Sequence, residues 1–490
     1  MLPKRANLSQ LSTHWDVLVI GGGITGAGVA LVASQLGLKV LLVEQQDYAW
    51  GTSSRSSKMV HGGLRYLSQG DFRLTRESLR ERELFLRELP HLVKRMPYYF
   101  PVIKGQFPGR WAMGIALWLY DKLAGVSETR WYGRSQLKKR WPHYVNPDAI
   151  GAYCYADALT DDSRLVMRVL QEASANGAEL MNYVKAQGIL PLEGVSQVTL
   201  VDAHTESTIS IKAKQVINAT GAWADELSGQ AAKIRPLRGS HLVLPAELLP
   251  VSSCLTLLHP RDKRPVFVFP WQGSTVVGTT DQDHGDSLAL EAKASTKEIN
   301  YLLDVITDAF PNITVNQADI VSTQAGVRPV IASGKGKDPS KERRDHLVWP
   351  GKGCINVSGG KLTTFRIIAL DALKAASLID TATYQRLYKQ KNVFSHDITW
   401  PQGLGDPLAQ FPNNDQLLIW WRWAIRYEQV HHLDDLLLRR THVGNHQRDG
   451  GLALLQANAQ WLQRELGWSE QRWQQEVARY QAIWREFYHA

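Results

Sequence analysis

Cysteine is scarce in this chain, and the residues present lie far apart: Cys154, Cys254 and Cys354. They form no CxxC pair and no metal-binding spacing, so we expect buried thiols, no metal site and a reducing compartment. No apolar run reaches the roughly 18 residues of a membrane-spanning helix. The first sixteen residues lack the apolar core of a secretory signal. These absences favour a cytoplasmic protein that touches a membrane, if at all, from the cytoplasmic side.

The chain has 490 residues, which is enough for several domains around a large core. Internal repeats and low-complexity tracts are missing. Its 56 lysines and arginines outnumber 47 aspartates and glutamates, and the formal net charge is +9. This balance favours acidic ligands or anionic surfaces without identifying one.

An apolar strand, a glycine turn, a helix and a second apolar strand follow one another over residues 16–45. Gly21 turns the chain off the strand, Gly23 leaves room for a pyrophosphate, and Gly26 lets helix and strand pack closely. The N-terminus of the helix attracts the phosphates. Glu44 follows at the distance at which an acid accepts hydrogen bonds from an adenosine ribose. Because this acid would repel a ribose 2′-phosphate, the pattern predicts FAD or NAD rather than NADP.

Helical and strand-like segments alternate along the rest of the chain. Apolar β-rich pieces over residues 234–280 predict an antiparallel sheet outside the parallel one. Amphipathic helices are expected over 163–175 and 297–308. The last hundred residues read as helical because large apolar side chains recur four and three apart over 473–487. This interleaving predicts an α/β fold in which two discontinuous domains share one cleft.

Several motifs follow the glycine turn in order: SSRSSKMVHGGLRYL from Ser53, YADALTDDSRLV (155–166), GSH (239–241), GTTD (278–281), GVRP (326–329), GGKLTT (359–364) and LDDLLLRRT (433–441). With them the chain resembles, nearly end to end, the FAD-dependent, membrane-associated glycerol-3-phosphate dehydrogenases. The resemblance implies a Rossmann-like FAD-binding domain (1–75, 150–232 and 320–380), an antiparallel-sheet substrate or cap domain (76–149 and 233–319) and a C-terminal helical domain (381–490). It also implies oxidation of glycerol 3-phosphate to dihydroxyacetone phosphate, with electrons leaving through a membrane quinone.

Alcohol oxidation by a flavin needs a base for the hydroxyl proton, and a phosphorylated substrate needs fixed cations. His241 is the candidate base, because the ordinary pKa of histidine lies near neutrality; a structural histidine at a strand start is the alternative. The candidate cations lie beside glycine turns or in loops: Arg65, Arg328, Arg344 and Lys361. Each has a solvated surface charge as its alternative, Arg344 above all, because it lies in a basic loop. The resemblance implies that Arg328 and Lys361 lie at the flavin–substrate junction and that Arg65 and Tyr66 face the substrate.

The resemblance also implies further FAD contacts, although loop hydroxyls commonly cap turns instead. Beside the glycine turn and Glu44 they are Ile24, Thr52, Ser53, Ser54, Ser57, Lys58, Gly62, Leu64, Gly221, Trp223, Asp281, Gly360, Lys361, Leu362 and Thr363. The hydroxyls and Lys58 would line the flavin or its pyrophosphate. Gly360, Leu362 and Thr363 would close on the flavin ring at a helix start.

Residues 104–141 hold eight lysines and arginines against Asp121 and Glu128. Aromatic residues are interleaved with them: Trp111, Trp118, Tyr120, Trp131, Tyr132 and Trp141. Basic and amphipathic aromatic side chains suit an anionic headgroup layer, so this stretch predicts peripheral attachment to the cytoplasmic face of the inner membrane. Cap-domain helices with a solvated basic face are the alternative. Nothing resembling a nucleic-acid-binding fold accompanies the stretch.

Two other functions stay open from the sequence. One is a flavin oxidase that uses oxygen on glycerol 3-phosphate, or acts on another hydroxy or amino acid; the cations favour a phosphate over a single carboxylate. The other is a flavin-containing binding or sensing protein without turnover, against which His241, Arg328 and Lys361 argue. Arg238 departs from the family pattern, which has lysine before GSH, and so bears on substrate size. A homodimer stays open as well.

Overall fold

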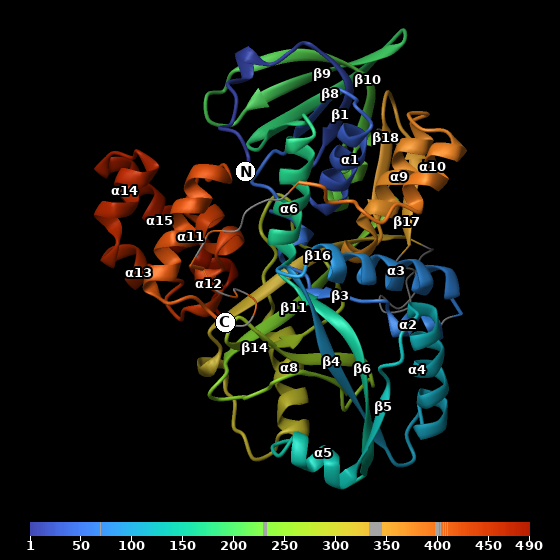
Figure 1. Ribbon diagram of the computed structural model, residues 1–490. Coiled ribbons are helices and arrows are strands. Elements are labelled where there is room, and N and C mark those ends of the chain that lie inside the picture. Colours follow the sequence, from blue (N-terminus) through green and yellow to red (C-terminus); the bar gives the residue numbers. More distant parts are fainter. Residues whose placement is uncertain are drawn as a thin grey trace.

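Two β-sheets built from alternating stretches of the chain form the frame of the computed structural model (Figure 1). The structure describes residues 1–68, 70–228, 233–332, 345–396 and, except for 402, 405, 407 and 409, 401–490. Within these residues one sheet has eight strands and the other has ten. The eight-stranded sheet lies in the upper half of Figure 1 and the ten-stranded sheet in the lower half, with the C-terminal helices to one side.

The eight-stranded sheet carries the predicted glycine turn. Its parallel strands are β18 (Ile355–Gly359), β10 (Thr208–Asn218), β1 (His14–Ile20), β2 (Val40–Val43) and β7 (Glu179–Met181), in that order. The antiparallel strands β17 (His346–Pro350), β8 (Val184–Leu192) and β9 (Val195–Asp202) complete it. Ile20 pairs with both Val43 and Asn218. Because parallel strands end at the same edge, the glycine turn, Glu44 and the segment after Asn218 meet there. The predicted α/β nucleotide-binding fold is confirmed.

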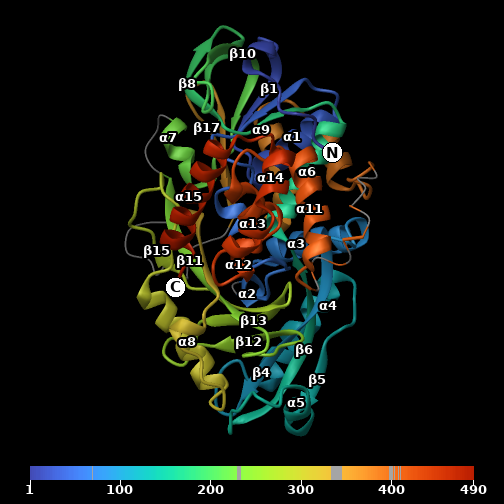
Figure 2. The same ribbon diagram turned by 90° about the vertical axis from the view of Figure 1, so that its left-hand side faces the viewer.

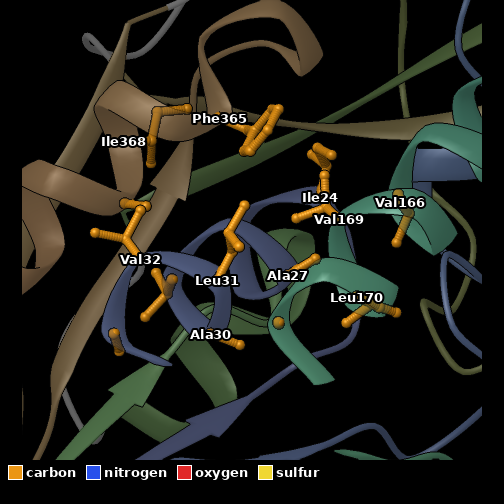
Figure 3. Close-up of a cluster of buried hydrophobic side chains, with 14 of the residues drawn as sticks. Ile24, Ala27, Ala30, Leu31, Val32, Val166, Val169, Leu170, Phe365 and Ile368 are labelled. Atoms are coloured by element: carbon orange, nitrogen blue, oxygen red, sulfur yellow. The ribbon is translucent and has the colours of Figure 1, made fainter. Parts of the chain in front are cut away.

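Helix α1 (Ile24–Gln35) follows the glycine turn and is buried on nearly every side. Helices α6 (Asp162–Ala175) and α9 (Phe365–Ala375) pack against it, and Figure 3 shows Leu31, Val169 and Phe365 in this cluster. Gly28 allows the close approach, since a Cβ there would lie 2.7 Å from Cδ2 of Phe365. A fully buried Leu, Val or Phe side chain contributes about 1.5–3 kcal/mol. This core therefore fixes the N-terminus of α1 at the edge of the sheet.

The second sheet runs in the order β15-β11-β14-β13-β12-β4-β6-β3, with β16 beside β11 and β5 beside β6. Its strands are β3 (Met59–Val60), β4 (Val93–Ile103), β5 (Arg130–Gly133), β6 (Ala149–Thr160), β11 (Ile234–Pro245), β12 (Cys254–Leu258), β13 (Pro265–Trp271), β14 (Ser274–Gly278), β15 (Gln282–Asp283) and β16 (Ser322–Ile331). Strands β11 to β14 confirm the antiparallel sheet expected over 234–280. Strands β3, β6 and β16 also pair here, although the predicted domain bounds place them with the nucleotide-binding part. A local apolar pattern identifies a strand but not the sheet that it joins.

Helices surround the second sheet: α2 (Leu64–Ser68), α3 (Phe72–Glu88), α4 (Arg110–Ala124), α5 (Arg134–Arg140) and α8 (Thr296–Ala309). Helix α8 is the helix expected over 297–308, and α6 is the one expected over 163–175. The short helix α7 (Ala224–Ser228) follows the turn after β10. In the described part of the chain, no helix is both long enough and apolar enough to cross a bilayer.

The C-terminal helices are α11 (Asn414–Tyr427), α12 (Val443–His446), α13 (Leu452–Ala457), α14 (Ala459–Leu466) and α15 (Glu470–Phe487). They face the viewer in Figure 2. On α15, Trp473, Tyr480 and Trp484 are buried, as their spacing predicts. Helix α10 (Thr381–Tyr388) packs on α9 instead, so part of the segment assigned to the C-terminal domain belongs to the nucleotide-binding core.

A buried ion-pair network joins the C-terminal helices to the eight-stranded sheet. It centres on the π-helix η7 (Asp435–Arg440), within the motif LDDLLLRRT. Arg440 donates to both carboxylate oxygens of Asp47 at 2.7 Å. Arg439 donates to Asp47 and to Asp435, both at 2.6 Å. Because Asp47 follows β2 and Glu44 closely in the chain, this motif anchors the helical region beside the nucleotide-binding edge.

Candidate active site

The glycine turn leaves no room for side chains. Gly21 has a φ of +113°, and a Cβ there would lie 2.6 Å from the carbonyl oxygen of Ala219. A Cβ on Gly26 would lie 1.9 Å from the carbonyl oxygen of Gly21. Residues 52–58, rich in serine and threonine, form a loop beside this turn (the hydroxyl loop). Ser53 Oγ accepts a hydrogen bond from the Ile24 amide at 3.0 Å, which ties the hydroxyl loop to the first turn of α1. The turn therefore exposes backbone amides to any ligand at this edge.

Glu44 stands beside this turn at the end of β2. Its Oε2 accepts a hydrogen bond from the Gly22 amide at 2.7 Å, and its Oε1 accepts one from the Gln46 amide at 2.9 Å. Burial raises the pKa of the carboxyl, and these amide hydrogen bonds lower it in part. The carboxylate thus fixes the turn, and its remaining lone pairs are available to a ribose.

A cleft runs along this edge of the sheet and holds about 1280 Å³ of empty space, part of it open to solvent. Many of the predicted cofactor residues line it: Gly21, Gly23, Ile24, Glu44, Thr52, Ser53, Gly221, Trp223, Gly360, Lys361 and Leu362. They come from the ends of β1, β2, β10 and β18 and from the hydroxyl loop. The structure therefore brings together residues that are more than three hundred positions apart in the sequence.

Other predicted cofactor residues, within the described part of the chain, do not line this cleft. Gly26 serves packing, Ser54 accepts from Lys58 through its carbonyl oxygen, and Leu64 begins α2. The Gly62 amide donates to Asp157, and Thr363 Oγ1 accepts from the His61 amide at 3.2 Å. Asp281 and Ser57 belong to the cluster around His241 that is described below.

Lys58 lies in a buried ion pair rather than in the cleft. Its Nζ is 2.7 Å from Oδ1 of Asp162, donates to the Ser54 carbonyl at 2.6 Å, and lies 4.9 Å from the ring centroid of Trp271. Asp162 in turn accepts from the Ser56 amide at 2.8 Å. Lys58 therefore holds the hydroxyl loop against the start of α6, and this contact could not be foreseen from the loop sequence alone.

His241 lies buried in the middle of β11. Its Nε2 is 2.9 Å from Ser57 Oγ. The imidazole also fills the space above Gly278, where a Cβ would lie 2.2 Å from its Cδ2. Burial, together with the positive charges of Arg328 and Lys58, lowers the pKa of His241 to about 3. The imidazole is therefore neutral at physiological pH, and its pKa is far below the near-neutral value of a free histidine.

Arg328 lies beside His241 on the neighbouring strand β16. Its guanidinium donates to Thr279 Oγ1 at 3.0 Å and to Asp281 at 3.2 Å. It covers Gly239, where a Cβ would lie 2.5 Å from Nη2. Asp281 also pairs with Arg264, so two guanidinium groups share one carboxylate.

Lys361 and Tyr66 form a second cationic position at the cleft. Lys361 Nζ lies 3.8 Å from the Tyr66 ring centroid and donates to Ser78 Oγ of α3 at 2.7 Å. A cation over an aromatic face is held in a fixed orientation. The predicted substrate residue Arg344 and the side chain of Arg65 lie outside the described residues.

The cofactor cleft and the His241 cluster lie next to each other, because consecutive residues of the chain contribute to both. Ser56 lines the cleft, and the next residue, Ser57, contacts His241. Pro329 lines the cleft, and it follows Arg328. Thr52 Oγ1 donates to the Val327 carbonyl, which ties the hydroxyl loop to β16. The His241 cluster thus lies next to one wall of the cleft, and Lys361 lines the cleft itself.

Sequence reasoning missed part of the cleft wall, namely Trp50, Ser56, Val184, Lys185, Ala186 and Pro329. Val184 to Ala186 begin β8 and reach the cleft because the Val184 amide donates to the Glu44 carbonyl at 2.8 Å. This strand has no motif, so only its alternating pattern could have marked it as a strand. Trp50 and Ser56 flank predicted residues and were within reach of the sequence.

The residues present fit an FAD molecule. The glycine cradle excludes Cβ atoms where a pyrophosphate would lie, the first turn of α1 offers amide groups, and Glu44 offers a ribose acceptor. Gly360, Lys361 and Leu362 line the same continuous cleft and would hold the flavin.

Comparisons with known proteins agree with this geometry. Residues 16–365 match the family described as "FAD dependent oxidoreductase", and residues 412–473 match "C-terminal domain of alpha-glycerophosphate oxidase". An aerobic glycerol-3-phosphate dehydrogenase of Staphylococcus aureus is 38% identical over 375 residues, which are 74% of this chain and 67% of that protein. A glycerol-3-phosphate dehydrogenase of Bacillus halodurans, solved with FAD, has a TM-score of 0.71 at 25% identity, over 97% of this chain and 94% of that one. An L-alpha-glycerophosphate oxidase of Mycoplasma pneumoniae shares the fold, with a TM-score of 0.62 at 20% identity, over 79% of this chain and 100% of that one.

Proposed function

The chain belongs to the family of FAD-dependent glycerol-3-phosphate dehydrogenases, and from that premise we propose that it oxidises sn-glycerol 3-phosphate to dihydroxyacetone phosphate and passes the electrons to a membrane quinone. The observation that carries this proposal is the buried imidazole of His241, which contacts Ser57 and feels the charge of Arg328; Ser57 and Arg328 are each next in the chain to a residue that lines the FAD cleft. A base and a cation at this place suit a phosphorylated alcohol.

His241 is the proton acceptor in this proposal. Ser57 Oγ, 2.9 Å from Nε2, marks how a hydroxyl oxygen approaches this nitrogen. When bound, FAD supplies the two-electron acceptor. As the alcohol becomes a ketone, Nε2 of His241 takes the hydroxyl proton, and a bound FAD would take up the hydride. The low pKa keeps the imidazole unprotonated before the substrate arrives.

The cations hold the phosphate. Arg328 presents a planar guanidinium whose orientation Thr279 and Asp281 fix, and guanidinium groups bind phosphate oxygens bidentately. Lys361, fixed over Tyr66, adds a second positive charge on the cofactor side. Because both cations are already held in place, little ordering is needed when the dianion binds.

Anaerobic mixing of the FAD-loaded protein with glycerol 3-phosphate tests the proposal. We expect the flavin absorbance to bleach with glycerol 3-phosphate and not with glycerol. His241→Gln should slow the bleaching about 100-fold. His259→Gln is the matched control, because His259 is a buried histidine that directly follows β12 of the same sheet and stacks on Tyr301, outside the site. Bleaching at the wild-type rate in His241→Gln would contradict the base assignment, and no bleaching of wild type would contradict the substrate.

Oxygen as the electron acceptor is the second candidate, and the match of residues 412–473 to a domain described from alpha-glycerophosphate oxidase favours it. Oxygen uptake and quinone reduction by the same preparation distinguish the two. Faster reoxidation by a quinone than by dissolved oxygen supports the dehydrogenase.

Attachment to an anionic membrane surface is the remaining part of the proposal, and an exposed apolar face of α4 supports it. Trp111, Ile115 and Trp118 recur four and three apart on α4 and are 80%, 66% and 59% exposed, and Phe107 just before the helix is 85% exposed. Tyr120 and Trp141, expected at the same surface, are buried and cannot meet lipid. The apolar face of α4, flanked by basic residues, suits an interfacial helix at the cytoplasmic side of the inner membrane.

A further inference from the structure

A second pocket lies outside the FAD cleft and shares no lining residue with it within the described chain. It holds about 1150 Å³ of empty space, part of it open to solvent. Its walls are α3, the end of α4, and the segment that follows α10. In Figure 1, α3 lies between α4 and α10 on the right-hand side of the molecule. The charged lining residues are Arg76, Arg80, Glu83, Arg87, Lys122, Arg366, Lys389 and Lys391.

The charge of this pocket is unbalanced. Its acidic residue Glu83 is already shared, because Arg82 and Arg95 donate to it at 2.7 Å and 2.6 Å. Arg366 pairs with Glu81, and Arg87 pairs with Glu88. Within the described chain, the other cations have no acidic partner: Arg76, Arg80, Lys122, Lys389 and Lys391. Cations gathered around one concavity repel one another, and a bound anion removes this repulsion.

The walls of the pocket are fixed to one another. The Arg80 guanidinium lies 4.0 Å from the Tyr388 ring centroid. Arg87 donates to the Lys391 carbonyl at 2.8 Å, and Arg366 donates to the Leu387 carbonyl at 2.7 Å. The segment after α10 is therefore held against α3, and these three guanidinium groups are oriented before any ligand arrives.

Helix ends explain only part of this cluster. Lys122 and Lys389 lie at the C-terminal ends of α4 and α10, where positive charge is stabilised by the helix dipole. Arg76 and Arg80 lie in the middle of α3, one turn apart, and gain nothing from a helix end. Both nevertheless line the pocket.

The geometry points to a binding site for a multiply charged phosphate group in this pocket. Several guanidinium and ammonium groups around one concavity, of which the Arg80, Arg87 and Arg366 guanidinium groups are held in place, match a ligand with many phosphate oxygens better than one with a single carboxylate. A soluble polyphosphate compound and the phosphates of anionic lipid headgroups share this chemistry. The site goes beyond the proposed oxidation, because Ser78 contacts Lys361 on one face of α3 while Arg76 and Arg80 line the pocket on another.

Calorimetric titration of the FAD-loaded protein with inorganic tripolyphosphate, at constant ionic strength, tests the site. The variant Arg76→Glu with Lys389→Glu should weaken binding by about tenfold or more. The control Lys212→Glu with Arg485→Glu changes the net charge equally at exposed positions on β10 and α15. It should leave the affinity at the wild-type value.

The outcomes separate the possible ligands. The site is overturned if wild type does not bind tripolyphosphate, or if the two double variants bind it with equal affinity. Equal affinities would be seen, for example, if tripolyphosphate bound at Arg328 in the active site instead. Where the pocket variant alone loses affinity, the site stands, and vesicles identify the source. Displacement of tripolyphosphate by phosphatidylglycerol vesicles, and not by phosphatidylcholine vesicles, assigns it to lipid headgroups. The absence of displacement assigns it to a soluble polyphosphate.

Discussion

Gly26 is a residue for which the structure permits no side chain. A Cβ there would lie 1.9 Å from the Gly21 carbonyl oxygen, which is backbone and cannot rotate away. We expect Gly26→Ala to lower the free energy of unfolding by about 3 kcal/mol or more and to reduce FAD content. Gly285→Ala is the control, because nothing lies within 4 Å of its Cβ position. Normal FAD content in Gly26→Ala would contradict the close packing of turn and helix.

The lowered pKa of His241 makes the stability of the folded protein depend on pH. Its pKa is about 3 in the folded protein, against about 6.5 in an unfolded chain. Between these values the unfolded chain binds more protons, so the stability contribution is complete above pH 6.5 and is lost as the pH falls toward 3. Lowering the pH from 7 to 5 should cost about 2 kcal/mol through this group. Urea unfolding at both pH values should therefore show a smaller loss in His241→Gln than in wild type; equal losses would contradict the pKa.

The contrast between Glu44 and Lys58 shows what sequence can predict for single residues. Glu44 lies where its distance from the glycine turn requires, because strand, turn, helix and strand form one local unit. Lys58 pairs with Asp162, more than one hundred positions away, and the sequence around Lys58 does not indicate that partner. The low pKa of His241 likewise depends on Arg328, a residue of another strand.

Elements follow the sequence more closely than their assembly does. The spacing of apolar residues predicts α6, α8 and α15, and the alternating pieces predict β11 to β14. Strands β6 and β16 lie within the ranges assigned to the nucleotide-binding domain but pair in the ten-stranded sheet, because pairing depends on partners far along the chain. Tyr120 was expected at a membrane surface, yet its hydroxyl donates to the buried carboxylate of Asp157. Composition counts aromatic residues without saying which side of a helix they occupy.

The π-helix η7 connects the C-terminal helices to the cofactor edge, and in its ion pair with Asp47 both the Arg440 and the Asp47 side chains are buried. Removing one partner leaves Asp47 without its bidentate cation, so Arg440→Met should lower the free energy of unfolding by about 3–5 kcal/mol. FAD content should fall as well, because Asp47 lies close to Glu44 in the chain. Arg422→Met removes an exposed ion pair with Glu465 and should cost less than about 1 kcal/mol. Similar losses in both variants, measured by urea unfolding, would show that η7 is no anchor.

On the scale of the whole molecule, the net charge of +9 is distributed over distinct surfaces. Arg328 and Lys361 serve the border of the cleft, the pocket of α3 gathers a separate group, and further basic residues flank α4 and α5. Helix α3 connects them, since it contacts both α4 and the short 3-10 helix η6 (Leu362–Thr364) that follows Lys361. The proposed transfer of electrons from a soluble phosphate ester to a membrane would benefit from a lipid-facing α4 packed against α3.

Docking on lipid should depend on two separable features of the surface. The apolar face of α4 supplies contact area, so Trp111→Ser with Trp118→Ser should weaken sedimentation with phosphatidylglycerol vesicles by about tenfold or more. The control Leu190→Ser with Leu290→Ser removes two side chains of 55% and 57% exposure elsewhere and should have no effect.

The basic residues supply attraction, so changing Lys138, Lys139 and Arg140, which end α5, to glutamate should weaken binding chiefly at low salt. If all three variants sediment like wild type, neither surface faces the membrane; if only the glutamate variant is impaired, attachment is electrostatic and α4 lies in water.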